Sequence, residues 1–255
     1  MSETATTRYP SRPIRPFRAA KAFFDLVGDR DDTRYVFDFF YAVNGRSNEA
    51  YYERFFQSDY GKAFLADPEA LGRTLTDRKT LESYGPGTLA AAYLHYLDSE
   101  NLQPLGVHDA SVETAPEMMA KLKEEWPDLY WLQYHGSLTH DLFHILTGYG
   151  RDALGEALLL VFSGLHTGSR GARLLGALAG LRIRAEIPSW PVGRMMKEAV
   201  RLANEAEHFP TADLTSLLPL PLEEARARVK IGRPALYQAT REAWTGPEPV
   251  TAKAA

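Results

Sequence analysis

The chain has 255 residues, of which 45% are hydrophobic and 24% charged, and its formal net charge is −4. This length is ample for a globular core, and the charge gives no basic excess that would favour nucleic acid. The absence of cysteine excludes disulfides, thiolate nucleophiles, iron–sulfur clusters and cysteine-ligated zinc. No stretch approaches the roughly 18 apolar residues of a membrane-spanning helix, and no signal peptide is evident, so we expect a cytoplasmic protein.

The N-terminal half predicts a flexible tail followed by helices. Residues 1–16 are rich in proline and arginine, and helical spacing of apolar residues begins at Phe17. Ser47 is a good N-cap, and Asp67-Pro68 is typical of a helix start. An alanine-rich helix is expected at about 86–101. The next segment, 107–116, is interpreted as a hinge between two helical layers.

The C-terminal half continues the helical pattern. Helices are expected at about 116–127, 129–148, 151–165, 171–183, 189–209 and 221–232, without alternating strands or a fixed repeat. The fold class predicted is therefore all-α. We expect a single-domain multi-helix bundle over residues 17–245, flanked by flexible tails at 1–16 and 246–255.

Two histidines and two carboxylates lie close together in the stretch THDLFHILTGYGRDALGE. His140 and His144 are four positions apart, so on a helix their rings share one face, one turn apart. That spacing suits a single metal ion. Asp141 lies about 100° around the same helix, from where it could bind the ion or orient a histidine ring.

Glu156 joins this group only if the chain turns back. On one continuous helix it would lie about 18 Å beyond His144. The intervening glycines of Gly148-Tyr149-Gly150 favour a helix end and a turn, and Asp152 can cap a second helix. Because buried acids and imidazoles are costly unless they pair or bind a cation, the pattern predicts a metal site at the apex of a helix hairpin.

The motif carries a family resemblance. HDLFH, eleven further residues and then Glu156 match the signature HDxxH-x11-E, and the segment from His140 to Gly168 is similar in character beyond the motif. The tract RYVFDFFYAV…YYERFFQSDYGKAFL and the later PLEEARARVKIG also fit. The chain thus resembles the ubiquinone (coenzyme Q) biosynthesis family of the COQ series, its fourth member. Arg151 in the turn departs from the pattern.

This resemblance implies an all-helical protein that binds a divalent metal, usually zinc, through His140, Asp141, His144 and Glu156. It implies loss of the C1 carboxyl group and hydroxylation at that carbon in a polyprenylated 4-hydroxybenzoate-derived precursor. It also implies contacts with other ubiquinone biosynthesis proteins and peripheral attachment to a membrane surface, on the cytoplasmic face of the inner membrane. A homodimer is left open.

The chemistry of the set leaves alternatives open. Two histidines with carboxylates suit zinc, but also Fe(II) or Mn(II), and a redox metal suits a reaction that involves dioxygen. Asp141, if it is not a ligand, is the candidate general base. The first hypothesis is an enzyme of ubiquinone biosynthesis; the second is a non-catalytic scaffold that binds prenylated lipids and presents them to partner enzymes.

Other candidate sites have ordinary structural alternatives. Glu205 and His208 form one E-x-x-H pair, whereas a di-iron bundle needs two such pairs and two more glutamates. The His140-Asp141 pair also occurs in metal-dependent phosphohydrolases, but those enzymes need a further upstream histidine and a downstream aspartate. His108, Asp109 and His135 do not form an obvious set of this kind. Two stretches could bind anions or an anionic membrane: Thr167, Ser169 and Arg170; and Arg8, Arg12, Arg15, Arg18 and Lys21 among aromatic residues.

Overall fold

A computed structural model describes residues 9, 13–28 and 34–249 of the chain. Within these ranges the secondary structure consists of fifteen α-helices and two short 3-10 helices, and the one β-type pairing is an isolated bridge between Thr88 and Pro221. The predicted all-α multi-helix class is confirmed. None of the described helices is both long enough and apolar enough to cross a membrane.

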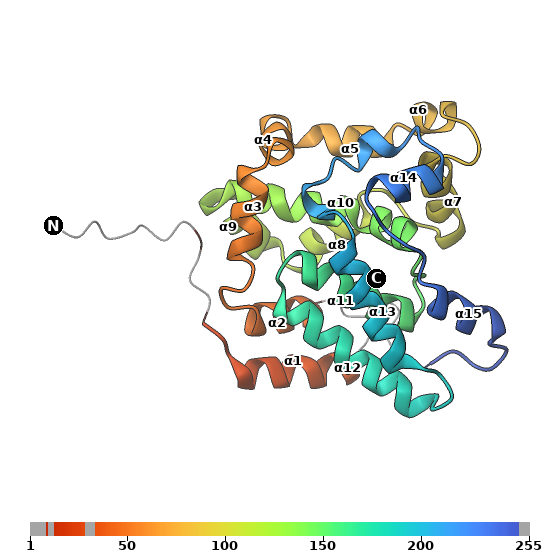
Figure 1. Ribbon diagram of the computed structural model, residues 1–255. Helices are drawn as coiled ribbons and strands as arrows, with labels where there is room; N and C mark the ends of the chain where they lie inside the picture. The colour runs from red at the N-terminus through yellow and green to blue at the C-terminus, as the bar shows by residue number, and fades with distance from the viewer. Residues whose placement is uncertain (1–8, 10–12, 29–33, 250–255) are drawn as a thin grey trace.

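The helices run in one continuous order along the chain (Figure 1). The first nine are α1 (Pro16–Gly28), α2 (Arg34–Val43), α3 (Glu49–Gln57), α4 (Asp59–Ala66), α5 (Glu69–Thr76), α6 (Arg78–Ser83), α7 (Leu89–Glu100), α8 (Gly106–Thr114) and α9 (Pro116–Glu125). The rest are α10 (Pro127–Thr147), α11 (Ala153–His166), α12 (Arg170–Glu186), α13 (Val192–Glu205), α14 (Leu222–Arg228) and α15 (Ala235–Ala243), with 3-10 helices η1 (Phe209–Thr211) and η2 (Thr215–Leu217) between α13 and α14.

Helix α10 lies at the centre of the molecule. Figure 1 shows it between α3–α7 on one side and α1, α2 and α12 on the other, and it contacts α5, α7, α8, α9, α11 and α14. Every residue from Leu138 to Thr147 except His140 is buried, as expected of a helix with apolar side chains on all faces. The polar side chains of this part of α10 are therefore held inside the protein.

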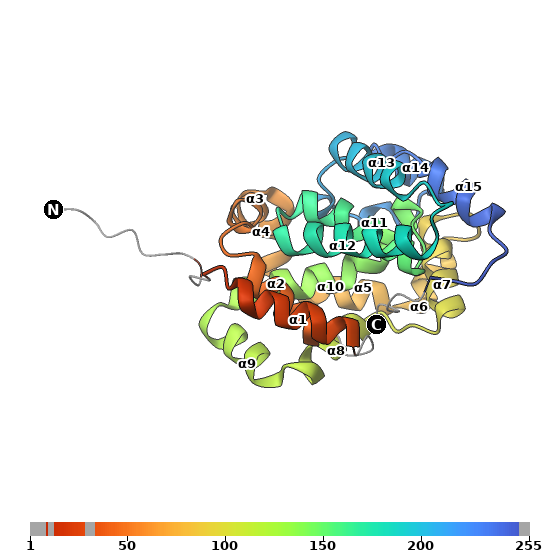
Figure 2. The same cartoon turned by 90° about the horizontal axis from the view of Figure 1, so that it is seen from below.

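A layer of antiparallel helices covers one side of α10. Helix α11 packs against α12 and α13, and α12 packs against α2, which in turn packs against α1 (Figure 2). A second, smaller core fills the space between α1, α2 and α12, formed by the buried Ala19, Ala22, Phe39, Ala42 and Leu175. Helix α11 is therefore held in place by contacts with α10, α12 and α13.

Three expectations about individual segments change with the structure. The expected hinge at 107–116 is instead helix α8, because His108 packs its ring on Tyr134 of α10, 4.8 Å between ring centroids. Helix α13 ends at Glu205, so His208 is not on the same helix. The leucine- and alanine-rich helix expected at 171–183 is core by default, yet the side chain of its Leu174 is 43% exposed.

The tails belong in part to the folded protein. The ring of Tyr9 is buried, and its hydroxyl donates to Glu53 at 2.8 Å. At the other end, the indole N–H of Trp244 donates to the carbonyl oxygen of Pro247 at 3.1 Å. Residues 1–8, 10–12 and 250–255 lie outside the described part of the chain, so the flexible tails and the domain limits of 17–245 stay predictions.

Candidate metal centre

The first helix of the predicted hairpin ends where the sequence indicates. Gly148 adopts the left-handed conformation, with φ of 79°, and its N–H donates to the carbonyl oxygen of His144 at 2.8 Å. Glycine takes this conformation without the steric penalty of a Cβ atom. Two further carbonyl groups at the end of α10, those of Ile145 and Leu146, accept hydrogen bonds from the Arg226 guanidinium at 2.9 and 3.1 Å.

The second helix begins at the predicted cap. The Asp152 carboxylate accepts hydrogen bonds from the N–H groups of Leu154 and Gly155, both at 3.2 Å, and Glu156 lies in the first turn. A Cβ atom at position 155 would lie 2.1 Å from the carbonyl oxygen of Gly150. Glycine at this position therefore allows the turn to pack directly against α11.

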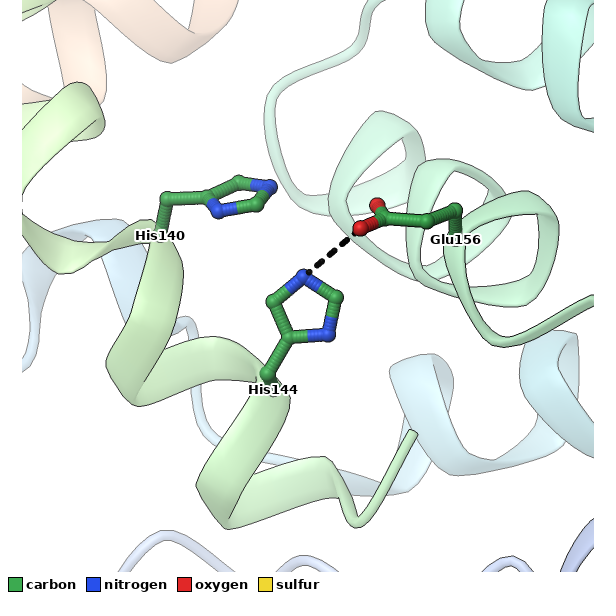
Figure 3. A group of neighbouring side chains, drawn as sticks. All are labelled: His140, His144 and Glu156. Atoms are coloured by element: carbon green, nitrogen blue, oxygen red, sulfur yellow. Dashed lines mark ion pairs between the residues drawn. The ribbon is translucent and has the colours of Figure 1, made fainter. Parts of the chain in front are cut away.

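The hairpin brings three of the predicted ligands together. One ligand atom from each of His140, His144 and Glu156 lies within 4.8 Å of the others, and no further group of this kind is found in the described residues. Figure 3 shows both histidines of α10 directed toward Glu156 of α11. Nε2 of His144 lies 3.4 Å from Oε1 of Glu156, about the distance that separates two ligands of a tetrahedral zinc ion with 2.0–2.1 Å bonds.

His144 is fixed in the protonation state that a metal ligand needs. Its Nδ1 lies 3.0 Å from the carbonyl oxygen of Tyr149, and because a carbonyl can only accept, Nδ1 carries the proton and Nε2 presents a lone pair. Burial lowers the pKa of His144 well below its usual value, and the neighbouring His140 charge adds to the effect. The ring is therefore neutral near pH 7.

His140 and Asp141 form a charged pair at the edge of the group. Nδ1 of His140 lies 3.5 Å from Oδ1 of Asp141, whose side chain is 9% exposed while that of His140 is 36% exposed. Burial lowers the pKa of His140, but the hydrogen bond with Asp141 and the charges of Glu156 and Asp141 outweigh it and raise the pKa. Asp141 is thus placed to orient His140, and its roles as ligand or base stay predictions.

Glu156 faces His144 without a hydrogen bond between them. Burial raises the pKa of Glu156, against the opposing charges of His140 and Arg151. Its Oε1 and Nε2 of His144 are both buried and have no hydrogen-bond partner. Two acceptors facing each other at 3.4 Å in a buried site are stabilised by a cation between them, and their nitrogen and oxygen donors suit zinc, Fe(II) or Mn(II). The residues present therefore fit a divalent metal.

Helix α7 contributes residues near the site that the sequence did not indicate. The Tyr96 ring stacks on His144 with 5.7 Å between centroids, and its hydroxyl oxygen is buried without a hydrogen-bond partner, as is that of Tyr93. Nη1 of Arg151 lies 3.7 Å from the Glu100 carboxylate. Nothing in the local pattern of α7 points to these tyrosines; they are found only when α7 is seen to pack on α10.

The C-terminal helix α15 anchors the turn. The hydroxyl of Tyr237 accepts a hydrogen bond from the N–H of Gly150 at 2.9 Å and donates one to the Asp152 carboxylate. Nε of Arg241 lies 3.6 Å from the same carboxylate. These contacts join residues more than 80 positions apart in the chain, so spacing alone could not reveal them.

Glu205 and His208, the alternative metal-binding pair, make structural contacts with other residues. Glu205 pairs with Arg201 at 2.7 Å on the exposed face of α13. His208 donates from Nε2 to the carbonyl oxygen of His166 at 2.7 Å and accepts at Nδ1 from the Thr211 hydroxyl at 2.9 Å. The E-x-x-H pair thus does not converge on one point.

The remaining sequence candidates also have local roles. Ser169 caps α12 by accepting from the N–H of Ala172 at 3.0 Å, and Thr167 donates its hydroxyl to the carbonyl oxygen of Ser163 at 2.9 Å. His135 lies 3.0 Å from the Tyr60 hydroxyl among buried aromatic rings. The anion site and the phosphohydrolase set therefore find no support in the described residues.

The fold is similar to that of a solved structure. No protein-family model matches the chain, and a search of curated proteins finds no match. A crystal structure of a Nostoc punctiforme PCC 73102 protein, provisionally named a ubiquinone biosynthesis protein, superimposes with a TM-score of 0.60 at 15% sequence identity, covering 86% of this chain and 99% of that one. At this identity the likeness establishes a shared fold.

Proposed function

We propose that this protein is a metal-dependent enzyme of ubiquinone biosynthesis. It removes the C1 carboxyl group from the ring of a polyprenylated 4-hydroxybenzoate-derived precursor and leaves a hydroxyl group at that carbon. The observation that carries this proposal is the buried group of His140, His144 and Glu156 at the hairpin apex. The HDxxH-x11-E signature and the fold shared with a protein provisionally named for ubiquinone biosynthesis support the pathway.

The reaction is a two-electron oxidation of the ring. The bond between C1 and the carboxyl carbon breaks, a carbon–oxygen bond forms at C1, and carbon dioxide leaves. With dioxygen as the oxidant, one oxygen atom enters the ring and the other leaves as water, and an external reductant supplies two electrons with two protons. The substrate, dioxygen and reductant are thus all needed for turnover.

The residues of the site divide this work. His140, His144 and Glu156 would hold the metal, which when bound supplies Lewis-acid stabilisation of substrate oxygens. Zinc agrees with the resemblance, whereas Fe(II) or Mn(II) would add redox chemistry. Asp141, buried beside His140, is the proposed general base for the ring hydroxyl proton; removing that proton raises the electron density at C1.

The exposed face of α1 supports a membrane-bound role. Phe17 and Phe24, seven positions apart on one face of the helix, are 91% and 71% exposed, while Arg18 and Lys21 pair with Asp38 and Asp25. We propose that this apolar face inserts into the membrane surface that holds the prenylated substrate. The same face suits the scaffold alternative, in which the protein holds prenylated lipids for partner enzymes without chemistry of its own.

The test combines turnover with lipid analysis. Untagged protein loaded with zinc, Fe(II) or Mn(II) is supplied with prenylated 4-hydroxybenzoate, dioxygen and a reductant, and carbon dioxide release and the ring product are followed by mass spectrometry. Turnover lost in Glu156→Gln supports the enzyme. Prenylated intermediates that co-purify without turnover under any metal would support the scaffold instead.

Lipid mass spectrometry of a deletion strain tests the pathway step independently. We expect an accumulated precursor that still carries its C1 carboxylate. Unchanged quinone levels in that strain would contradict the assignment to this pathway.

A further inference from the structure

Arg151 and Tyr96 both lie near the metal group: burial raises the pKa of the Tyr96 hydroxyl, and the positive charge of Arg151 opposes that shift. Glu100 and Tyr96 are four positions apart on α7 and share one face of that helix. Arg151 contacts Glu100 with 3.7 Å between Nη1 and Oε2, and its side chain is 19% exposed. Because Tyr96 also stacks on His144, its phenol lies against one predicted ligand, and the ion pair with Glu100 holds the Arg151 guanidinium near the same face of α7.

The chemistry of these two groups indicates what they recognise. A guanidinium is a permanent cation with only N–H donors, and a tyrosine hydroxyl near pH 7 offers a donor. The hydroxyl of Tyr96 is buried and has no acceptor in the protein, a state that costs free energy unless a ligand fills it. The charge of Arg151 lowers the pKa of His140, His144 and Glu156 alike, which places it near all three.

We propose that Arg151 and the Tyr96 hydroxyl form an anion subsite beside the metal group, which binds a carboxylate or phenolate oxygen of the substrate. This inference rests on the proposed function. It gives a specificity role to Arg151, a residue of the turn that departs from the family pattern. One acidic oxygen of the substrate would then contact the metal on one side and Arg151 and the Tyr96 hydroxyl on the other.

The surrounding charges make the subsite depend on the metal. Glu156 belongs to the metal group, Asp141 lies beside His140, and Glu100 pairs with Arg151, so without a cation an incoming anion meets several carboxylates. The positive charge of Arg151 weakens the binding of a metal cation by repulsion and strengthens the binding of an anion by attraction. A residue with only a structural role would weaken both kinds of binding when it is replaced.

The first test measures two affinities in the full-length protein. Zinc binding and the binding of 4-hydroxybenzoate to the zinc-loaded protein are measured by calorimetry for the wild type, Arg151→Gln and Arg151→Lys. We expect Arg151→Gln to bind zinc more tightly, yet 4-hydroxybenzoate roughly 10-fold more weakly, as for loss of a charge-assisted hydrogen bond. Arg151→Lys keeps the charge and should recover part of the anion affinity. Weaker zinc and anion binding in parallel would overturn the subsite.

A second variant isolates the hydroxyl. Tyr96→Phe keeps the ring that stacks on His144, so we expect unchanged zinc affinity and weaker 4-hydroxybenzoate binding. Tyr130→Phe is the matched control, because its ring is also buried but packs on His108 and Trp131 rather than on the metal group. Equal anion affinity in Tyr96→Phe and Tyr130→Phe would exclude Tyr96 from the subsite.

The outcomes separate this inference from the proposed function. Zinc and anion binding that depend on Arg151 and Tyr96, without turnover of the prenylated substrate, would leave the subsite standing and remove the enzyme proposal. Turnover of the prenylated substrate, with an affinity for 4-hydroxybenzoate that does not depend on Arg151 or Tyr96, would support the enzyme proposal and remove the subsite. A wild-type protein that binds zinc but not 4-hydroxybenzoate would also overturn the subsite.

Discussion

Nδ1 of His144 donates to the carbonyl oxygen of Tyr149 at 3.0 Å, so the turn determines which nitrogen of this histidine faces Glu156. The glycine-rich turn therefore has two roles. It redirects the chain so that the first turn of α11 faces the histidines near the end of α10, and it supplies the acceptor that fixes the tautomer of a ligand. A metal-ligating histidine whose other nitrogen bonds a carbonyl is a common arrangement, and here both parts come from one short segment.

Replacing Glu156 by glutamine should abolish tight metal binding. The amide keeps the shape of the side chain but loses the negative charge that faces His144. We expect a loss of zinc affinity greater than the roughly 10–100-fold that follows mutation of residues supporting the ligands, measured by metal analysis of untagged protein. Glu205→Gln is the matched control, because Glu205 pairs with Arg201 on the surface; equal metal content in both variants would exclude Glu156 as a ligand.

Much of the hairpin could be predicted from residue spacing. The four-residue interval between His140 and His144 places both on one face, and Gly148 and Asp152 are a helix stop and a helix start with direct physical causes. The structure confirms both ends. Local rules suffice here because each one concerns residues within a single helical turn.

The rest of the site depends on contacts that spacing does not encode. Tyr96 reaches His144 only through the packing of α7 on α10, and Tyr237 reaches the turn from the end of the chain. The proline and small residues of the segment 107–116 predict a hinge, and this prediction is wrong: α8 covers the segment up to Thr114, and His108 packs on Tyr134 of α10. Such tertiary contacts outweigh local propensity.

Metal affinity should fall as the pH is lowered. The pKa of His140 and that of Glu156 are both raised, so in acid each holds a proton that a metal must displace. The pKa of His144 is lowered, so this ring stays available well below pH 6.5. Calorimetry of zinc binding between about pH 5.5 and 8, in buffers of different ionisation enthalpy, should show net proton release. A zinc affinity that does not depend on pH would contradict this competition between protons and the metal.

Asp141→Asn in the same titration separates the roles of that residue. If Asp141 only orients His140, the variant lowers the pKa of His140, and the fall in zinc affinity moves to lower pH. If Asp141 is itself a ligand, affinity falls at every pH. If the pH dependence of zinc affinity is unchanged in Asp141→Asn but turnover is lost, Asp141 acts as the general base.

Removing the hydroxyl of Tyr237 should loosen the turn. This hydroxyl accepts from the N–H of Gly150 and donates to Asp152, the cap of α11. We expect Tyr237→Phe to lower the free energy of unfolding by about 1–3 kcal/mol, the typical cost of an unmade hydrogen bond, and to weaken zinc binding because Glu156 follows the cap by one turn. Chemical denaturation and calorimetry measure the two effects. Tyr84→Phe, at a partly exposed site, should change neither.

Replacing the exposed rings of α1 should release the protein from membranes. Phe17 and Phe24 are 91% and 71% exposed, and transfer of such rings into the bilayer interface removes apolar surface from water. We expect Phe17→Ser with Phe24→Ser to lower the partition onto phospholipid vesicles at least about tenfold, measured by co-sedimentation. Tyr84→Ser is the control, because α6 and α1 lie on opposite sides of the molecule (Figure 1). Unchanged partition, with a change in sedimentation coefficient instead, would make this face a contact between two copies of the chain.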